Sequence, residues 1–323
     1  MGVFCDYISN LPDNVIERLL LEFPMKDGAK TSVLSTKWRY KWAAVPQLKF
    51  YDYIDEIPAN YSIVNIIDHV LLLHIRPIHK FELSHTCVNN MLSFRDMDRW
   101  IFVLSSLRIN APNLRDFQFY GIFEDIVLKN TVLLSTVGIY LESLIKDDKS
   151  GRLTDFICSL PRIKELTMDT NLLKYLVRDN VPGDLPVQST RLKFLSMLIN
   201  FLSPKEILAA LCMLRCAPNL HKLEIVVCNS AQASESVEEP KIDIFQGLDY
   251  LSSTFSHLEH VKINQVAGLK LELEFIEVLL ASAAGLKDVT IELGIGYERS
   301  EIYKELLQFR RASPQAKIIY LDH

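Results

Sequence analysis

The spacing of apolar positions changes after the first fifty residues of the chain. Near the N-terminus, apolar residues recur at the spacing of one helix face: Val15, Ile16, Leu19, Leu20 and Phe23. Pro12 stands just inside the expected start, where its missing N–H costs nothing, and Pro24 stops the pattern. The sequence therefore predicts an amphipathic helix between these two prolines.

Two further short helices are predicted before residue 50. Asp27 can cap the first of them, and Ser35 can cap the second, in which Trp38 and Trp42 stand four residues apart on one face. A unit this small has little core of its own. We therefore expect its remaining apolar face to need a neighbour that covers it.

A different pattern, apolar-x-x-apolar-x-apolar, recurs through the rest of the chain. It begins at Ile78, Leu114, Leu134, Ile163, Leu192, Leu220, Leu258 and Leu286, with intervals of 36, 20, 29, 29, 28, 38 and 28 residues. The last three positions of each unit alternate as in a short strand, and several intervals lie near the upper end of the leucine-rich-repeat period. The pattern predicts an α/β fold, a leucine-rich-repeat-like solenoid of stacked strand–helix units preceded by the small three-helix unit.

The outward position of each predicted strand falls on one common face. These positions are candidate contacts for a target: Glu82, Gln118, Gly138, Thr167, Ser196, Glu224, Lys262 and Thr290. Each of them could equally be an ordinary solvated residue, and only the shared face makes the set of interest.

Helices are expected between the strands, over 98–104, 152–160, 204–216, 271–284 and 301–311, with a last strand over 317–320. Prolines and a glycine mark a loop at 182–186. The polar, acidic stretch 231–240 is expected to be a surface loop, and it accounts for one of the two long intervals.

Composition and charge narrow the class of protein. With 323 residues and 49% hydrophobic residues, the chain is predicted to fold, and its net charge of −5 argues against nucleic acid as its general partner. Residues 26–49 are basic and include Trp38, Tyr40 and Trp42, but we interpret this stretch as a complement to an acidic protein partner. Neither a secretory signal nor a membrane span is apparent, and six scattered cysteines are typical of reduced thiols, so we expect a location in the cytoplasm, the nucleus or both.

Candidate catalytic and metal-binding patterns are weak. His69, His74 and His79 lack helical metal-site spacing, and Cys212 and Cys216 have no second ligand pair nearby, so buried thiols are the favoured interpretation. No nucleophile-elbow motif is present. We expect no catalytic residues, no metal site and no cofactor.

The N-terminal residues resemble an F-box of the plant type, over residues 4–50. The resemblance rests on Leu11-Pro12-x-x-Val15-Ile16-x-x-Leu19-Leu20, Phe23-Pro24 and Val33-Leu34-Ser35-x-x-Trp38-Arg39-x-x-Trp42. It implies docking on a Skp-type adaptor and, through it, on a cullin scaffold. The implied adaptor-facing or packing residues are Leu11, Pro12, Ile16, Leu19, Leu20, Val33, Leu34 and Trp38. Any of these residues could instead belong to the internal core.

The C-terminal residues 241–323 resemble the FBD segment of plant F-box/FBD/leucine-rich-repeat proteins. The resemblance rests on residues 258–263, Gly268, residues 272–280, residues 286–291 and residues 306–314. It sets the expected domains as an F-box at 4–50, a connecting segment and first repeat at 51–105, repeats at 106–230, the acidic loop at 231–240 and FBD-type terminal repeats at 241–323. Relative to this family, we expect repeat units to be absent near Ser105.

Together the two resemblances imply a substrate-recognition subunit of a Skp–cullin–F-box ubiquitin ligase. The F-box would bind the adaptor, the repeats would bind a target protein, and the chain itself would catalyse nothing. Two alternatives stay open from the sequence: an interaction scaffold without ligase output, and a receptor that holds a small ligand on the repeat face.

Overall fold

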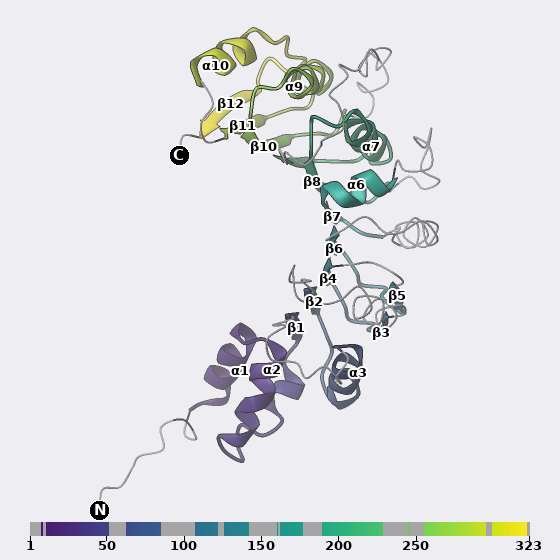
Figure 1. The fold of residues 1–323 in the computed structure, drawn as a ribbon, viewed down its shortest axis with the longest axis vertical. Helices are drawn as coiled ribbons and strands as arrows, with labels where there is room; N and C mark the ends of the chain where they lie inside the picture. The colour runs from purple at the N-terminus through teal and green to yellow at the C-terminus, as the bar shows by residue number, and fades with distance from the viewer. Residues whose placement is uncertain are drawn as a thin grey trace, which may run out of the picture. The chain divides into compact units, whose positions relative to one another are not determined.

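A computed structural model describes residues 8, 11–51, 63–84, 107–121, 126–141, 160, 162–176, 189–228, 245, 255–294 and 299–321. The chain divides into two compact units. The N-terminal unit comprises residues 1–136 and 141–156, and the C-terminal unit comprises residues 137–140 and 157–323. Each unit combines helices with parallel strands (Figure 1).

The N-terminal unit begins with a small helical segment. It contains α1 (Asp13–Glu22), α2 (Met25–Lys30) and the 3-10 turns η1 (Thr31–Val33) and η2 (Lys41–Ala44). Ile16 and Leu20 of α1 are buried together with Met25, Trp38 and Trp42. The first predicted helix is thus confirmed, and one side of its apolar stripe forms the core of the segment.

The two later helices differ from the sequence prediction. The second helix begins at Met25 directly after Pro24, so Asp27 lies inside it and is not its cap. The third helix is replaced by a turn, in which Ser35 O accepts the N–H groups of Trp38 and Arg39, followed by η2. The reason is Tyr40, whose φ of 66° is left-handed and interrupts helical hydrogen bonding between the two tryptophans.

The strands of the N-terminal unit are parallel and follow chain order. They are β1 (Gln47–Tyr51), β2 (Lys80–Ser84) and β4 (Asp116–Gly121), and α3 (Ile63–Leu73) connects the first two. Phe81 and Phe117 are partners in register, and Phe50, whose partner in register is Leu83, lies diagonally across from Phe81. The ring centroids are 5.4 Å apart for Phe50 and Phe81 and 6.0 Å apart for Phe81 and Phe117. This buried aromatic row forms the core of the unit's sheet.

A separate parallel pair, β3 (Leu107–Asn110) with β5 (Ile126–Lys129), was not predicted. β5 lies within the shortest repeat interval, the 20 residues that separate Leu114 from Leu134. A connection of this length leaves little room for a helix, and a short extended strand spans it instead.

The C-terminal unit repeats a strand–helix arrangement. Its strands lie side by side in chain order, and they begin with residues 137–140 of β6 (Thr136–Leu141). The others are β7 (Glu165–Met168), β8 (Phe194–Ile199), β9 (Lys222–Val227), β10 (His260–Val266), β11 (Asp288–Leu293) and β12 (Lys317–Leu321). Its helices are α6 (Thr170–Leu176), α7 (Pro204–Arg215), α9 (Lys270–Ser282) and α10 (Arg299–Gln308). Figure 1 shows α6, α7 and α9 on one side of these strands.

The predicted repeat pattern is confirmed, because a strand lies at each of its eight positions, namely β2, β4, β6, β7, β8, β9, β10 and β11. Inward residues such as Leu195, Met197, Leu223 and Ile225 are fully buried. The predicted helices at 204–216, 271–284 and 301–311 correspond to α7, α9 and α10, and the predicted last strand is β12. The fold class, α/β of the leucine-rich-repeat type, follows from this arrangement.

Several predictions fall outside the described residues. These are the helix at 98–104, the helix at 152–160 apart from its buried last residue Leu160, the loop at 182–186, the acidic loop at 231–240 and the junction near Ser105. The domain boundaries drawn from the sequence also stay predictions. In the part of the chain that the structure describes, no helix has the length and apolar character needed to cross a membrane.

Candidate interaction surfaces

The helical segment at the N-terminus carries both a buried core and exposed apolar side chains. Of the predicted adaptor-facing residues, Ile16, Leu20 and Trp38 are buried and Leu11 is half-buried. Pro12, Leu19, Val33 and Leu34 are exposed, the last two to 86% and 48%. The buried residues cannot contact an adaptor, because they pack within this chain.

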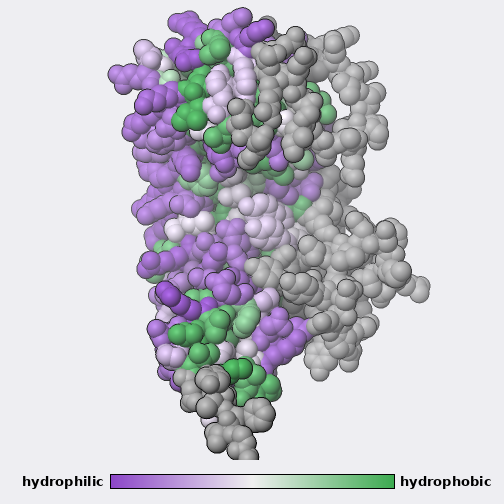
Figure 2. All heavy atoms as spheres, turned by 90° about the vertical axis from the view of Figure 1, so that its left-hand side faces the viewer, coloured by the Kyte–Doolittle hydropathy of each residue, from purple (hydrophilic) through white to green (hydrophobic). Residues whose placement is uncertain are grey.

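Phe23 was not among the predicted adaptor-facing residues, although it is 40% exposed one helical turn after Leu19. Its place in the same apolar stripe was the signal that could have added it. We define the apolar patch as Pro12, Leu19, Phe23, Val33 and Leu34. Hydrophobic side chains gather over this part of the chain in Figure 2.

Polar contacts fix the turns that present the apolar patch. Trp38 Nε1 donates to the carbonyl of Ile8 at 3.0 Å, and Lys49 Nζ donates to the carbonyl of Leu21 at 3.0 Å. Lys41 Nζ lies 3.0 Å from Asp13 Oδ2, and this ammonium lowers the pKa of the Asp13 carboxyl. Lysines that the sequence suggested for an acidic partner, Lys41 and Lys49 among them, are therefore engaged within the chain.

The predicted target-facing positions form rows across neighbouring strands. In the C-terminal unit, Thr167, Ser196, Glu224, Lys262 and Thr290 are consecutive in register from β7 to β11, and all five are half-buried. In the N-terminal unit, Glu82 and Gln118 are paired in register on β2 and β4. The structure thus brings the candidates of each unit onto one face, while their role in binding stays a prediction.

Two details modify the predicted rows. Gly138 on β6 is buried and has no side chain to project, so its inclusion among the target contacts was wrong. Glu224 is engaged with its neighbours, because Asn264 Nδ2 donates to Glu224 Oε1 at 3.1 Å and Lys262 Nζ lies 3.7 Å from the same oxygen. Among the described strands, Thr167, Ser196 and Thr290 contribute small hydroxyls to the same row.

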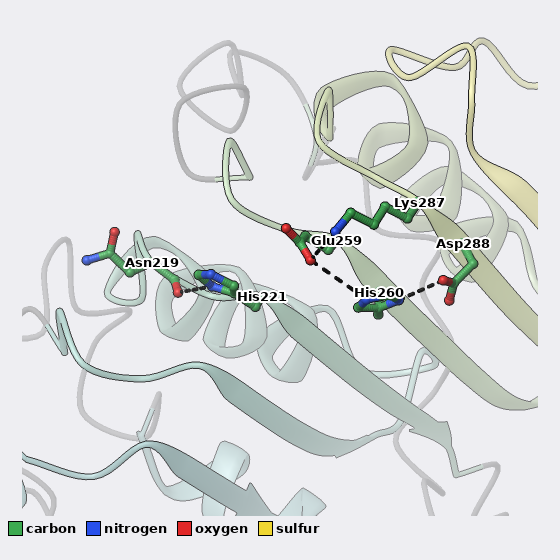
Figure 3. A network of polar contacts seen from close by, with 6 residues as sticks. All are labelled: Asn219, His221, Glu259, His260, Lys287 and Asp288. Atoms are coloured by element: carbon green, nitrogen blue, oxygen red, sulfur yellow. Dashed lines mark hydrogen bonds and ion pairs between the residues drawn. The ribbon is translucent and has the colours of Figure 1, made fainter.

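The start of the strands in the C-terminal unit carries a polar network that the sequence did not reveal (Figure 3). His260 Nδ1 lies 2.6 Å from Asp288 Oδ2, and Lys287 Nζ donates to Glu259 Oε2 at 2.7 Å. His260 Nε2 is also 3.8 Å from Glu259 Oε2. The network links β10 to β11, and the Lys287 ammonium lowers the pKa of the Glu259 carboxyl.

Buried carboxylates are the other feature that the sequence analysis missed. Glu206 and Glu272, each in the first turn of its helix, have no exposed surface, and Asp169 is also buried before α6. The glutamate oxygens accept backbone N–H groups of the strand-to-helix loops, Asn200 for Glu206 and Ala267 and Leu269 for Glu272. Asp169 accepts the N–H of Leu172 in the first turn of α6. Such acceptors stabilise the loops, which makes these carboxylates structural.

Burial dominates the acid–base behaviour of the two glutamates. It raises the pKa of Glu206 and raises that of Glu272 to about 7, although the backbone N–H groups favour the charged forms. A Ser-x-x-Glu pattern at Ser203 to Glu206 was a signal that could have pointed to a glutamate turned back on the helix start. Among the described residues, no three His, Cys, Asp or Glu side chains gather in a way that could hold a metal ion.

The strands and helices together define a leucine-rich-repeat protein with a small helical segment at its N-terminus. The chain is homologous over its full length to an F-box/FBD/LRR-repeat protein of Arabidopsis thaliana, with 27% identity over 425 residues and 100% coverage of both chains. The family resemblance seen in the sequence is thereby confirmed. The alignment is longer than the 323 residues of this chain, so the relative contains residues without a counterpart here.

Two further relatives match about half of the chain. An FBD-associated F-box protein of Arabidopsis thaliana is 38% identical over 227 residues, which is 53% of each chain. An F-box/LRR-repeat protein of the same plant is 29% identical over 188 residues, covering 51% of this chain and 49% of the relative. No family model matches the chain. Among solved structures, the leucine-rich-repeat protein LegL7 of Legionella pneumophila is 13% identical, covers 98% of this chain and 90% of its own, and has a TM-score of 0.38.

Proposed function

We propose that this chain is the target-recognition subunit of a Skp–cullin–F-box ubiquitin ligase. Its N-terminal helical segment docks on a Skp-type adaptor and thereby on a cullin, and its repeats hold a target protein. The chain contributes no covalent chemistry, because its effect is to raise the local concentration of the target near the ubiquitin-loaded enzyme. The names of its relatives support the F-box part of this proposal.

The exposure of Val33 and Leu34 is the observation that carries the proposal. Val33 has the highest exposed fraction of the large hydrophobic side chains among the described residues, and a partner's groove would remove it and Leu34 from water. Leu19 and Phe23, 39% and 40% exposed, extend the same apolar patch along α1. Ile16 and Leu20 are buried and hold the segment together, so the patch can bind a partner without unfolding.

A pull-down with a purified Skp-type adaptor tests the docking surface. The variant Val33→Glu/Leu34→Glu places two charges in the apolar patch, and we expect adaptor recovery to fall at least about tenfold. The matched control is Val132→Glu/Leu133→Glu, because this valine–leucine pair is also exposed, to 59% and 45%. Equal adaptor recovery with the two double variants would overturn the proposed surface.

Target turnover separates this proposal from the scaffold alternative. A recognition subunit accumulates ubiquitinated partners when the proteasome is inhibited, and it loses them when the apolar patch is mutated. A scaffold binds the adaptor equally well but shows no such accumulation. Affinity purification with mass spectrometry under proteasome inhibition, with wild type and the Val33→Glu/Leu34→Glu variant compared, distinguishes the two.

A further inference from the structure

Residues at the start of neighbouring strands stand on adjacent rungs in the C-terminal unit. Lys193 N donates to Lys164 O at 2.7 Å, His221 N to Lys193 O at 3.0 Å, Glu259 N to His221 O at 2.9 Å, and Lys287 N to Glu259 O at 2.8 Å. Parallel strands are about 4.8 Å apart, so side chains on neighbouring rungs interact. We call the row Lys164, Lys193, His221, Glu259 and Lys287 the opening row.

Charges at the β10–β11 end of this row are neutralised within the chain. Lys287 Nζ is 2.7 Å from Glu259 Oε2, and His260 on the next position of β10 is bonded to Asp288 of β11 (Figure 3). Each of the side chains Glu259, His260, Lys287 and Asp288 therefore has a polar partner within the chain. This end of the row stabilises the sheet and needs no external ligand.

The β7–β9 end of the same row is different. It carries five exposed basic side chains, with the exposed Glu165 as the one acidic side chain among them on β7. We define the five as the basic cluster: Arg162, Lys164, Arg191, Lys193 and Lys222. Among the described residues, no carboxylate lies within ion-pair distance of Lys164, Lys193 or the two arginines. Lys222 Nζ lies 5.1 Å from the centre of the Phe194 ring.

Such a cluster lowers the free energy of unfolding, because like charges on neighbouring strands repel each other. Lys164 and Lys193 are held on adjacent rungs by the backbone hydrogen bond between them. The chain as a whole has a net charge of −5, so the cluster does not follow from composition. An external ligand with negative charge would relieve the repulsion.

We propose that the basic cluster, with the adjoining face of β7–β9, binds a short acidic protein segment rich in aspartate or glutamate. Thr167 and Ser196 are partners in register, three residues after Lys164 and Lys193, and offer small, half-buried hydroxyls on the outward face of β7 and β8. The three strands span about 10 Å, the width of a few extended residues. Carboxylates of the segment pair with the basic cluster, and its backbone lies over the hydroxyls.

The surroundings of the basic cluster favour an acidic peptide over nucleic acid. Phe194 is half-buried under Lys222, so it offers no open ring for base stacking. A long polyanion would also continue past β9 to Glu259 and Asp288, whose carboxylates already contact Lys287 and His260. A short segment stays on the basic cluster. The assignment of the segment to a ubiquitination target rests on the proposed function, whereas the binding itself requires no adaptor.

Fluorescence anisotropy with the full chain and a labelled oligo-glutamate peptide tests this inference. We expect the peptide to bind, and the affinity to fall as salt shortens the range of charge interactions from about 10 Å at 0.1 M to about 3 Å at 1 M. Lys164→Glu/Lys193→Glu is expected to weaken binding at least about tenfold. The matched control is Lys205→Glu/Lys270→Glu, which changes the net charge equally but at exposed lysines of α7 and α9, and we expect it to weaken binding less than about threefold.

Three results would overturn the inference: no binding of oligo-glutamate by the wild type at low salt, equal weakening by the two double variants, or displacement of the peptide by a single-stranded oligonucleotide at lower concentration than by unlabelled peptide. Circular dichroism checks the fold of each variant, and Lys164→Gln/Lys193→Gln must weaken binding in the same direction. Adaptor pull-down with the same variants keeps the two proposals apart. If a variant loses peptide binding but recovers the adaptor normally, the basic cluster is affected and the adaptor-binding proposal is not.

Discussion

Both carboxylate oxygens of Glu272 accept a hydrogen bond from the backbone N–H of Ala267, at 3.1 and 3.2 Å. One of them also accepts the N–H of Leu269 at 3.1 Å, so the side chain turns back over the loop that precedes α9. Glu206 repeats the arrangement before α7, where its Oε2 accepts the N–H of Asn200 at 3.0 Å. In two repeats, therefore, a fully buried glutamate holds the connection from strand to helix.

The burial of Glu272 predicts that stability decreases as pH rises. Its pKa is about 7 in the folded chain against an ordinary value of 4.5, so the folded state binds the proton more tightly than the unfolded state. The contribution is therefore fully present below about pH 4.5 and is lost progressively as pH rises to about 7, by up to roughly 3 kcal/mol. Glu206 acts in the same direction.

Urea unfolding of wild type and Glu272→Gln between about pH 5 and pH 8 isolates this contribution. Glutamine is neutral throughout, so the free energy of unfolding of the wild type should fall relative to the variant as pH rises. A difference between the two proteins that stays constant over this range would contradict the burial argument. Other titrating groups cancel in the comparison, because both proteins contain them.

Two glycines are predicted to respond to alanine with opposite signs. Gly268 has a φ of +78°, and a Cβ there would lie 2.8 Å from Ile302 Cδ1 and 2.9 Å from its Cγ1. Gly268→Ala should therefore lower the free energy of unfolding by about 1–3 kcal/mol. Gly28 lies inside α2, and its Cβ would meet Trp42 and Leu20 at 3.7 and 3.8 Å, which are ordinary contacts.

Gly28→Ala should accordingly raise the free energy of unfolding, by about 0.5–1 kcal/mol, since alanine favours the helix and restricts the unfolded chain. Thermal unfolding of the two single variants beside wild type measures both effects. A loss of stability at Gly28 as large as that at Gly268 would show that contact space, and not backbone conformation, decides both substitutions.

The sequence predicted the repeat strands well because burial there depends on a period of two. Leu195 and Met197 can face only the core once Ser196 faces outward, and the same holds on every strand of the pattern. The register between strands then follows from the backbone ladder. As a result, Thr167, Ser196 and Glu224 could be placed on one face from spacing alone.

The features that sequence analysis missed depend on tertiary contacts. Ile16 and Leu19 belong to the same apolar stripe, yet only the packing of Trp38 and Trp42 decides that Ile16 is core and Leu19 is exposed. Tyr40 adopts a left-handed conformation that its side chain does not favour. Glu272 contradicts the general rule that glutamate stays on the surface, because the N–H groups that compensate its burial come from a loop.

Buried Ile16 and exposed Leu19, which we propose to lie on the docking side of α1, yield a paired prediction. Ile16 is fully buried, so Ile16→Ala should lower the free energy of unfolding of the N-terminal segment by about 2–5 kcal/mol. Leu19 is 39% exposed, so Leu19→Ala should change stability by no more than about 0.5 kcal/mol while it reduces adaptor recovery. Proteolysis of the N-terminal segment and adaptor pull-down measure the two effects separately. A strongly destabilised Leu19→Ala variant would contradict the assignment of Leu19 to the docking side.

The pair formed by His260 and Asp288 is predicted to contribute little stability despite its short distance of 2.6 Å. The two side chains are 44% and 33% exposed, so water already solvates them and screens their attraction. A double-mutant cycle with His260→Asn and Asp288→Asn should give a coupling energy of about 0.2–1 kcal/mol that decreases with added salt. The same cycle on Glu259 and Lys287, which are 2.7 Å apart and 35% and 61% exposed, should also give a small coupling that decreases with added salt. A coupling of several kcal/mol at either pair would mean that the β10–β11 end of the opening row is a structural centre of the sheet. Small values would leave charge neutralisation as the role of these pairs. The β10–β11 end would then differ from the β7–β9 end, where the lysines have no such partners.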